Sequence, residues 1–600
     1  MAKNKKDKKK KLVISLWINQ TKYNFGCLCT FCKKQTAILH CKECPDFFCL
    51  DCDTTAHATK KREKHVRDKD ALSAQLSITS SSLESHITTL SSDEFQGRFP
   101  GTVGEVKTIQ YLIDNFSNMG LQPGNPNGEW IQKATMTGVT SELRAQFITD
   151  KERSVLMTGK DIIGNSFIKK NKVNLLNKEI IFCGYGVFAP EYEWNDFKDV
   201  DVKGKIIVVL VNDPPVTENG ELDDDYFGGK AMTYYGRWSY KFEEGLRRGA
   251  AGVIVVHETE AAGYPFSVLQ NSYKGEQLTI VDPSKTPLSF QGWIPKSTAN
   301  KLFSMSGYNF DDQKALSSKK DFKPIVLNAK FTSRINNRSR TFSSNNFVGK
   351  YEGNDPVLKN EYIIYTAHWD HLGIDRSLDG DQVYNGANDN ALGTGIVIDA
   401  AKAFSKLKKG TKRSILFLAV TAEEQGLLGS NFYNINPLYP LEKTVAVINI
   451  DAMGNTYGKT KDLIVVGKGN SNLDQVLEFA AKQDRKYLVP NPSPEKGFYY
   501  RSDHFPFAKN GIPSLYVGGG VDVVGKGKDF GLKMQNRYNS DFYHQVGDEI
   551  LDDWDFAGTE QDARILFRVG YAISQHTEWP QWSEGNEFRA TREKMLSKLD

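Results

Sequence analysis

EYIIYTAHWDHLG, residues 361–373, begins as a run of apolar residues and ends in His368 and Asp370. The apolar run is typical of a buried β-strand, and a metal-binding type of side chain follows at its carboxyl end. Two other runs have the same plan and end in acidic residues: SILFLAVTAEE at 414–424 and TVAVINID at 444–451. In open α/β sheets the functional groups gather along the edge where such strands end.

Helical stretches separate these strand candidates. GTGIVIDAAKAFSKL at 393–407 and NLDQVLEFAAKQ at 472–483 carry apolar residues at helical spacing. The alternation of strands and helices predicts an α/β fold, in which a mostly parallel sheet is covered by helices on both faces.

Five short segments between residues 360 and 550 supply polar groups: TAHWDHLG, NGANDNALGT, TAEEQGLLGS, INIDAMG and FYHQVGDE. The candidate metal ligands in them are His368, Asp389, Glu424, Asp451 and His544. Each of these residues alone is more often a cap or a solvated loop residue. Together, two imidazoles and three carboxylates suit a pair of zinc-type ions that share one bridging carboxylate. Such a pair polarises a carbonyl and lowers the pKa of a bound water, which favours hydrolytic chemistry.

Two further acids have predicted roles beside the ligands. Glu423 and Glu424 are adjacent, so their side chains cannot point the same way; one binds metal while the other faces the water. This favours Glu423 as the general base that later protonates the leaving amine. The alternative is an acid that stabilises a helix N-terminus. Asp370 lies two residues after His368, where we expect it to accept the second imidazole N–H, although a surface aspartate is the alternative.

The motifs resemble those of the M28 metallopeptidases, a family of co-catalytic zinc aminopeptidases and carboxypeptidases, over roughly residues 80 to 580. The matching motifs are His368-Trp369-Asp370, Asn388-Asp389-Asn390, Glu423-Glu424, Asp451 in NIDAMG and His544 in YHQVGDE. The resemblance implies that His368 and Asp451 hold one zinc ion, while Glu424 and His544 hold the other. It also implies that Asp389 bridges the two ions and that a cis peptide bond follows it.

By this resemblance the chain is expected to be a zinc-dependent exopeptidase, most simply an aminopeptidase. It would hydrolyse peptide bonds with a metal-bridged hydroxide and Glu423 as general base. A carboxypeptidase or dipeptidase is one alternative, with Arg501 as the cation for the substrate carboxylate. A glutaminyl-cyclase-like enzyme with one metal is another, and an interaction scaffold with a vestigial peptidase is a third. His504, near Arg501, is either a substrate-site residue or a structural histidine.

The cysteines indicate a separate zinc-binding segment. Seven of the eight lie between residues 27 and 52. Six of these form three CxxC pairs that are followed by two histidines, and Cys27 is left over. The spacing resembles a B-box zinc finger. That resemblance implies two structural zinc sites, one formed by Cys29, Cys32, Cys49 and Cys52 and one by Cys41, Cys44, His57 and His65. It implies a protein partner and no specific nucleic acid; a disulfide framework is the alternative.

The length of 600 residues exceeds a single core and predicts several domains. We expect a basic disordered tail at 1–26, the finger at 27–70, peptidase parts at 71–140 and 331–580, an insert at 141–330 and a C-terminal tail at 581–600. The peptidase part opens with 90–124, where a loop containing Arg98 precedes a helix. Segments 179–215 and 243–258 resemble a protease-associated (PA) domain. This implies that the insert walls the substrate cleft and selects substrates.

Charge is distributed unevenly along the chain. Residues 1–70 carry 17 Lys and Arg against 8 Asp and Glu, whereas the net charge of the whole chain is +4. The lysine-rich tail suits RNA, acidic proteins or anionic membrane as partners, acts as a nuclear address, or is simply solvated. LVISLWI at 12–18 is too short for a membrane span, and no apolar run approaches about 18 residues. These features predict a cytoplasmic protein that does not span a membrane, and the M28 resemblance implies peptide substrates.

Overall fold

The computed structural model describes residues 39–40, 47–48, 70–218, 221–280, 286–453 and 455–597. Their contacts define two compact units. The described parts of unit 1 lie within Met1–Ala134, Ser344–Asn491 and Ser502–Asp600, and those of unit 2 within Thr135–Ser343 and Pro492–Arg501. Residues 492–501, which the sequence-based division assigns to the peptidase part, pack with unit 2.

The sheet of unit 1 has parallel strands at its centre. In spatial order its strands are β23 (Tyr487–Pro490), β22 (Asp462–Val466), β24 (Ser514–Gly519), β21 (Thr444–Asn449), β17 (Tyr362–His368), β20 (Ser414–Val420) and the end of β16 (Ile325–Tyr351), beside β3 (Gln122–Pro123). Strands β20, β17, β21 and β24 run parallel. Strand β16 pairs antiparallel with β20, and β22 pairs antiparallel with β24 but parallel with β23. The sheet is therefore mixed. The prediction of a mostly parallel sheet holds for its central strands.

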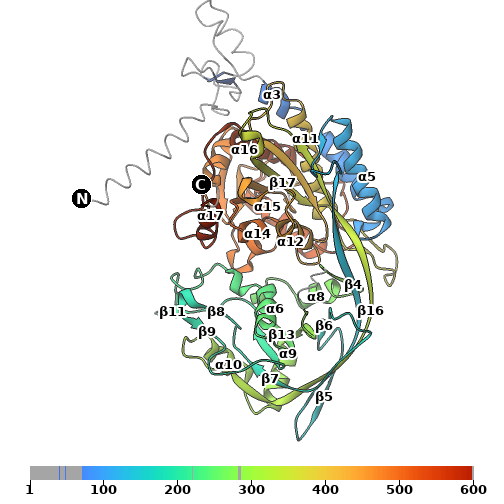
Figure 1. Cartoon of the computed structure of the whole chain (residues 1–600), viewed down its shortest axis with the longest axis vertical. Coiled ribbons are helices and arrows are strands. Elements are labelled where there is room, and N and C mark those ends of the chain that lie inside the picture. The colour runs from blue at the N-terminus through green and yellow to red at the C-terminus, as the bar shows by residue number, and fades with distance from the viewer. Residues whose placement is uncertain are drawn as a thin grey trace, which may run out of the picture. The chain divides into compact units, whose positions relative to one another are not determined.

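Helices cover both faces of this sheet, as the sequence predicts (Figure 1). In β17, Ile363, Tyr365 and Ala367 point into one apolar core, and Ile364 points into a core on the opposite face. Strand side chains alternate between faces, so an all-apolar strand needs cover on both. The first core contains α4 (Ser80–Leu90), α5 (Val103–Asn118), α11 (Leu392–Ser405), α13 (Leu473–Lys482) and α16 (Ala557–Gln575); the second contains α12 (Leu428–Ile435) and α14 (His504–Lys509).

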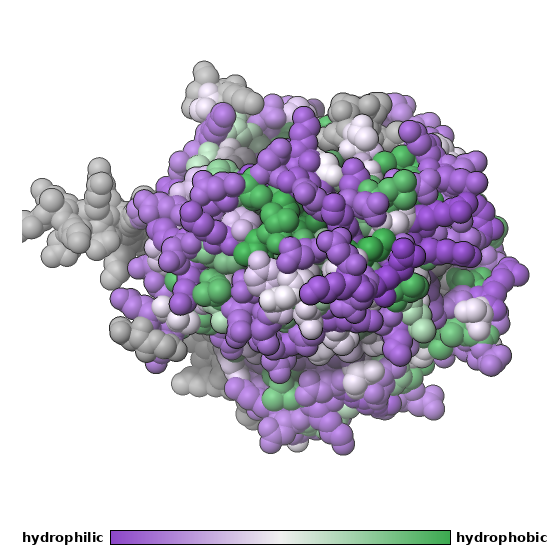
Figure 2. Space-filling view, turned by 90° about the horizontal axis from the view of Figure 1, so that it is seen from below, coloured by the Kyte–Doolittle hydropathy of each residue, from purple (hydrophilic) through white to green (hydrophobic). Residues whose placement is uncertain are grey.

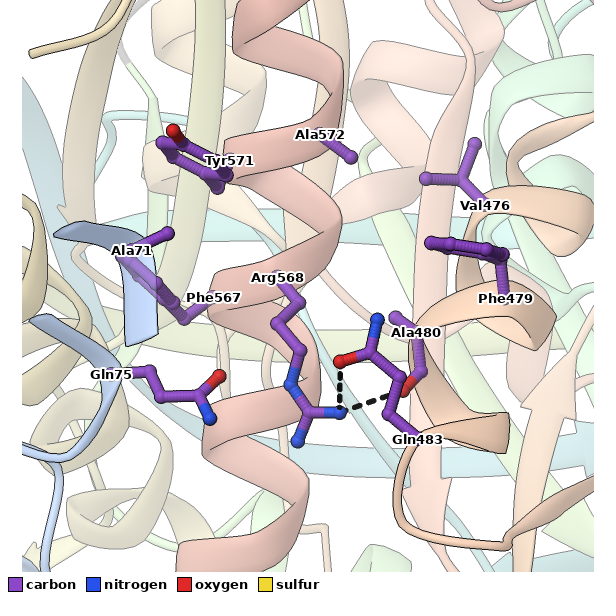
Figure 3. A pocket seen from close by; sticks show the side chains of 10 residues that line it. All are labelled: Ala71, Gln75, Val476, Phe479, Ala480, Gln483, Phe567, Arg568, Tyr571 and Ala572. Carbon is purple, nitrogen blue, oxygen red and sulfur yellow. Dashed lines mark hydrogen bonds between the residues drawn. The ribbon is translucent and has the colours of Figure 1, made fainter. Parts of the chain in front are cut away.

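Helix α3 (Asp70–Gln75) packs against α11 and α16 at the edge of the first core, with α13 across a hollow from it. Figure 3 shows the small apolar hollow between them, lined by Phe479 and Phe567 among others. At its base, Arg568 donates hydrogen bonds to the carbonyl oxygen of Ala480 and to Gln483. The first described helix is thereby part of the core of unit 1. Helices α15 (Lys528–Asp541) and α17 (Arg589–Leu596) complete the unit.

Unit 2 is a second α/β body. Strands β7 (Lys172–Phe182), β10 (Ile206–Leu210), β13 (Gly252–His257) and β15 (Phe290–Pro295) run parallel, and β6 (Ile163–Asn165) pairs antiparallel with β15. Helices α9 (Lys296–Met305) and α10 (Phe310–Ser317) cover one face, and α6 (Trp238–Arg247) and α8 (Phe266–Ser272) the other. Cys183 is fully buried.

The remaining elements of unit 2 are hairpins and long edge strands. They comprise β4 (Ile131–Ile148), β5 (Arg153–Leu156), β8 (Phe188–Ala189), β9 (Trp194–Asn195), β11 (Thr217–Glu218), β12 (Glu221–Leu222), α7 (Thr259–Ala262) and β14 (Gln277–Ile280). Short Gly-rich turns link them, which agrees with the alternating strand pattern of the sequence.

Two short strands are described ahead of α3: β1 (Leu39–His40) pairs antiparallel with β2 (Phe47–Phe48). The predicted zinc ligands of the finger, from Cys29 to His65, lie outside the described residues. Within the described parts of the chain, no helix is long and apolar enough to cross a membrane. The face drawn in Figure 2 is mainly hydrophilic, with smaller apolar patches between.

Candidate metal centre

Three of the predicted ligand segments meet at one edge of the unit 1 sheet. His368 is the last residue of β17, Glu424 follows β20, and Asp451 follows β21. Strand β17 pairs in parallel with both neighbours, and His368 lies opposite Val420 in β20. The carboxyl ends of the three strands therefore coincide, which is the reason that ligands distant in sequence come together.

Asp389 lies in a tight turn, Ala387–Ala391, at the start of α11. Gly386 precedes the turn with φ 55°, and a Cβ atom there would lie 2.2 Å from the carbonyl oxygen of Asp389. Only glycine fits that position without displacing the turn. The Asp389–Asn390 peptide bond is cis, as the resemblance implies. The turn is wholly buried and directs the Asp389 carboxylate toward the two histidines.

The two oxygens of Asp389 face different histidines. Oδ1 lies 3.3 Å from Nε2 of His368, and Oδ2 lies 3.3 Å from Nε2 of His544. Each histidine also meets a second carboxylate: His368 Nε2 is 3.2 Å from Asp451 Oδ1, and His544 Nε2 is 3.0 Å from Glu424 Oε2. The five side chains form two ligand groups that share one carboxylate.

Left-handed backbone conformations occur at four non-glycine positions in the five ligand-bearing segments: at Leu427, with φ 60°, and at three positions that are, or adjoin, candidate site residues. Ala422, Ala452 and His544 have φ values of 54°, 39° and 56°. Each such residue costs of order 1–3 kcal/mol, and the surrounding structure must compensate for it. Ala422 precedes Glu423, and Ala452 follows Asp451. Local strain therefore accompanies the turns that aim the candidate ligands.

The carboxylates of the site favour positive charge on the histidines beside them. Burial alone would lower the pKa of both histidines, but Asp451 raises the pKa of His368 well above its usual value, and Glu424 and Asp389 raise the pKa of His544 to about 10. Burial would raise the pKa of the carboxylates. The histidines nevertheless hold the pKa of Asp389 well below its usual range, and His544 and His371 lower the pKa of Glu424 to about 2.

This donor set fits a pair of divalent cations. Metal ions bind the deprotonated forms of histidine and carboxylate, and their charge replaces that of the protons. Imidazole and carboxylate together suit zinc. Single ligand atoms of His368, Asp389 and Asp451 lie within 4.8 Å of one another, and so do those of His371, Asp389 and Glu424.

Glu423 lies beside the ligands without belonging to either group. One carboxylate oxygen of Glu423 lies within 4.8 Å of a ligand atom of His368 and of Glu424. The main-chain N–H of Glu423 donates to Oδ1 of Asp370 at 3.1 Å. Burial raises the pKa of Glu423 well above its usual value. A carboxyl whose pKa is raised by burial is suited to take up and return a proton.

The contact between His368 and Asp370 differs from the sequence-based prediction. Nδ1 of His368 lies 3.1 Å from the main-chain carbonyl oxygen of Asp370, whereas the nearer carboxylate oxygen is 3.8 Å away. The carboxylate turns instead to the N–H of Glu423. Burial raises the pKa of Asp370 to about 8. The imidazole orientation is thus held by the backbone, while the Asp370 side chain positions the Glu423 segment.

Three residues at the site have no role in the sequence analysis. Nδ1 of His371 lies 2.6 Å from Oε1 of Glu424. Ser502 donates to Oδ2 of Asp451 at 2.5 Å, and the side-chain amide of Asn449 donates to Ser502 in turn. His371 lies within TAHWDHLG, so its position in that motif could have identified it as a further site residue. The part played by Ser502 depends on tertiary contact and has no local sequence signal.

Asp548, in the motif that contains His544, holds the turn of the bridging carboxylate. Its two carboxylate oxygens accept the main-chain N–H groups of Asn388 and Asp389, each at 3.1 Å. Its own carbonyl oxygen accepts the N–H of Ala387 at 2.9 Å. Burial raises the pKa of Asp548 to about 6. Asp548 therefore joins the two segments that carry Asp389 and His544.

We expect Asp548→Asn to weaken metal binding by about tenfold or more, the usual scale for losing a group that orients a ligand. The amide retains one acceptor, but its NH2 group faces the second main-chain N–H and disturbs the turn. Titration with zinc against a chelator of known affinity measures the effect.

Asp462→Asn is the matched control for this substitution. Asp462 is also buried and accepts two main-chain N–H groups, those of Val521 and Asp522, outside the ligand cluster. It should change thermal stability without changing zinc affinity. Equal zinc affinities for the two variants would contradict the role of Asp548.

Among the described residues, neither predicted substrate-site residue belongs to a group of candidate metal ligands. His504 is buried at the start of α14, with its ring centroid 4.9 Å from that of Tyr516. Arg501 belongs to unit 2, donates to the carbonyl oxygen of Ala262 at 2.8 Å and lies over the Phe498 ring.

The sequence of this segment matches a known family. Residues 346–565, which contain every residue of the ligand cluster, match the description "Peptidase family M28". Aminopeptidase YwaD of Bacillus subtilis (strain 168) is 29% identical over 225 residues, which cover 37% of this chain and 43% of that protein. Aminopeptidase NAALADL1 of Mus musculus is 34% identical over 122 residues, or 20% of this chain and 15% of that protein.

One solved structure illustrates the extent of the likeness. The aminopeptidase from Aneurinibacillus sp. strain AM-1 is 18% identical, with a TM-score of 0.48, and the comparison covers 84% of this chain and 96% of that chain. The sequence matches span less than half the length of the two relatives named above. Together, the family match and the ligand cluster support the assignment of residues 346–565 to the M28 metallopeptidases.

Proposed function

We propose that this protein is a zinc-dependent aminopeptidase. One observation carries the proposal: the two oxygens of the Asp389 carboxylate face His368 and His544, and each histidine has a carboxylate partner of its own. Two ions that share a bridging carboxylate require this arrangement of donors. The aminopeptidases among the relatives agree with the choice of substrate class.

His368, Asp451, Asp389, Glu424 and His544 would hold the zinc pair. When bound, the pair supplies Lewis acid chemistry, which polarises the substrate carbonyl and acidifies water. Glu423 accepts a proton from the attacking water as the C–O bond forms. It returns that proton to the amine nitrogen as the C–N bond breaks. Asp370 holds the main chain of Glu423 through its N–H.

The test compares peptides with free amino termini, blocked amino termini and blocked carboxyl termini, using the full chain. We expect hydrolysis to require the free amine, to stop on mild chelation and to return with added zinc or cobalt. Cleavage that requires a free carboxylate would favour the carboxypeptidase alternative, with Arg501 to be tested as its cation. Cyclisation of amino-terminal glutamine with one ion per site would favour the cyclase-like alternative. Absence of all three activities in a chain that binds zinc would contradict the proposal.

We further propose that the cysteine-rich segment is a B-box-like finger with two structural zinc ions. The spacing of its CxxC pairs and histidines supports this, and thiolate sites bind zinc tightly. Elemental analysis should then give about four zinc ions in the full chain, of which mild chelation removes about two.

The insert at 141–330 is proposed to be PA-like on the basis of its sequence motifs.

A further inference from the structure

Arg98 is a fully buried cation in the loop that precedes α5. It is 1% exposed and ends the turn Asp93–Arg98 with φ 50°, a left-handed conformation. Burial lowers the pKa of its guanidinium to about 10, so the side chain remains charged at neutral pH. A buried charge is costly unless its donors are satisfied, so the partners of Arg98 indicate its purpose.

All four hydrogen bonds of the guanidinium go to main-chain carbonyl oxygens. Nε donates to Trp369 at 2.8 Å, Nη1 to Asn385 at 2.6 Å, and Nη2 to Gly386 at 2.9 Å. Nη1 also donates to Leu90, the last residue of α4, at 2.6 Å. Trp369 stands between His368 and Asp370, and Gly386 immediately precedes the turn of Asp389. One side chain therefore ties together two segments that carry catalytic ligands.

Neighbouring contacts strengthen the same connection. The side-chain amide of Asn385 donates to the carbonyl oxygen of Ser91 and to the carboxylate of Asp93. A Cβ atom on Gly97 would lie 2.4 Å from the carbonyl oxygen of Gly373, so this glycine allows the Arg98 turn to approach the hairpin between the two ligand segments. The main-chain N–H groups of the Asp389 turn bind Asp548. An arginine thus holds the carbonyl groups of the two residues that precede the turn, and an aspartate holds N–H groups of the turn itself.

Resting on the proposed function, we propose that Arg98 is a positioning residue that sets the distance between the His368 and Asp389 segments, so that one carboxylate reaches both metal ions. The planar guanidinium presents five donors in a rigid fork and can hold carbonyls of two segments at once. A lysine ammonium keeps the charge but concentrates its donors at one atom. Arg98→Lys therefore separates geometry from charge.

The test compares Arg98→Lys with Arg413→Lys in the full chain. Arg413 is also buried and donates to the main-chain carbonyls of Ile573 and Thr577, but it lies at the opposite end of β20 from Glu423. The measurements are thermal stability, affinity for each of the two labile ions, kcat and KM. The magnetic coupling of a cobalt-loaded site reports directly whether the two ions share a bridge.

We expect both lysine variants to lose thermal stability. Only Arg98→Lys should lower the affinity for the more weakly bound of the two labile ions, by about tenfold or more, and kcat by a similar factor. The magnetic coupling between the two cobalt ions should weaken, and KM should change little. Equal metal affinity, coupling and kcat in the two variants would overturn the proposal. If Arg98→Lys does not fold, Asn385→Ala removes part of the same connection, and unchanged metal affinity in that variant overturns it as well. A wild-type chain that binds no labile pair of ions would instead contradict the proposed function.

Discussion

Glu423→Gln is expected to lower kcat by at least about 100-fold, the usual scale for losing an acid–base residue. Glutamine keeps the size of the side chain and leaves Asp389, Glu424 and both histidines in place. It cannot accept the proton of the attacking water. Steady-state hydrolysis of a free-amine peptide at saturating substrate measures the change.

Metal content is the control for this substitution. Glu423 belongs to neither of the two ligand groups formed around Asp389, so the variant should retain both labile zinc ions with nearly unchanged affinity. Turnover close to that of the wild type would show that another group carries the proton. Loss of one ion together with activity would instead make Glu423 a ligand, and its nearness to His368 and Glu424 makes this a meaningful alternative.

Asp389→Asn is expected to weaken both catalytic ions together and to abolish measurable hydrolysis. The two oxygens of Asp389 face different histidines, so replacing one of them by an NH2 group removes one ligand atom and the bridging charge. Zinc titration monitored by elemental analysis should show that the affinities of both catalytic ions are lowered, not that of one ion alone.

Asp451→Asn provides the comparison, because Asp451 faces one of the two histidines, His368, whereas Asp389 faces both. It should loosen one ion and leave the other near its original affinity. Loss of a single ion in Asp389→Asn, with the second bound as in the wild type, would contradict the bridging role of Asp389.

Much of the centre of the protein was predictable from local sequence. All-apolar runs such as those of β17 and β20 need cover on both faces, so they predict a helix-covered sheet. The ligands follow these runs directly, and parallel pairing brings them to one edge. Histidines and carboxylates in those positions indicate the metal chemistry, and the family resemblance extends this to the cis bond after Asp389. The outer strands were not predictable, because the antiparallel direction of β22 depends on the path of the chain around it.

The supports of the site were decided only by the tertiary structure. Arg98 contacts Trp369 across 271 positions of sequence, and Asp548 contacts Asp389 across 159. A buried arginine or aspartate has no local signal that names its partner, since its hydrogen bonds go to main-chain groups that every residue carries. The carboxylate of Asp370 likewise turned to the N–H of Glu423, because the carbonyl oxygen of Asp370 already meets the imidazole. The types of side chain in the motifs thus indicate which metal ions the chain can bind, whereas tertiary packing determines the distances between those side chains.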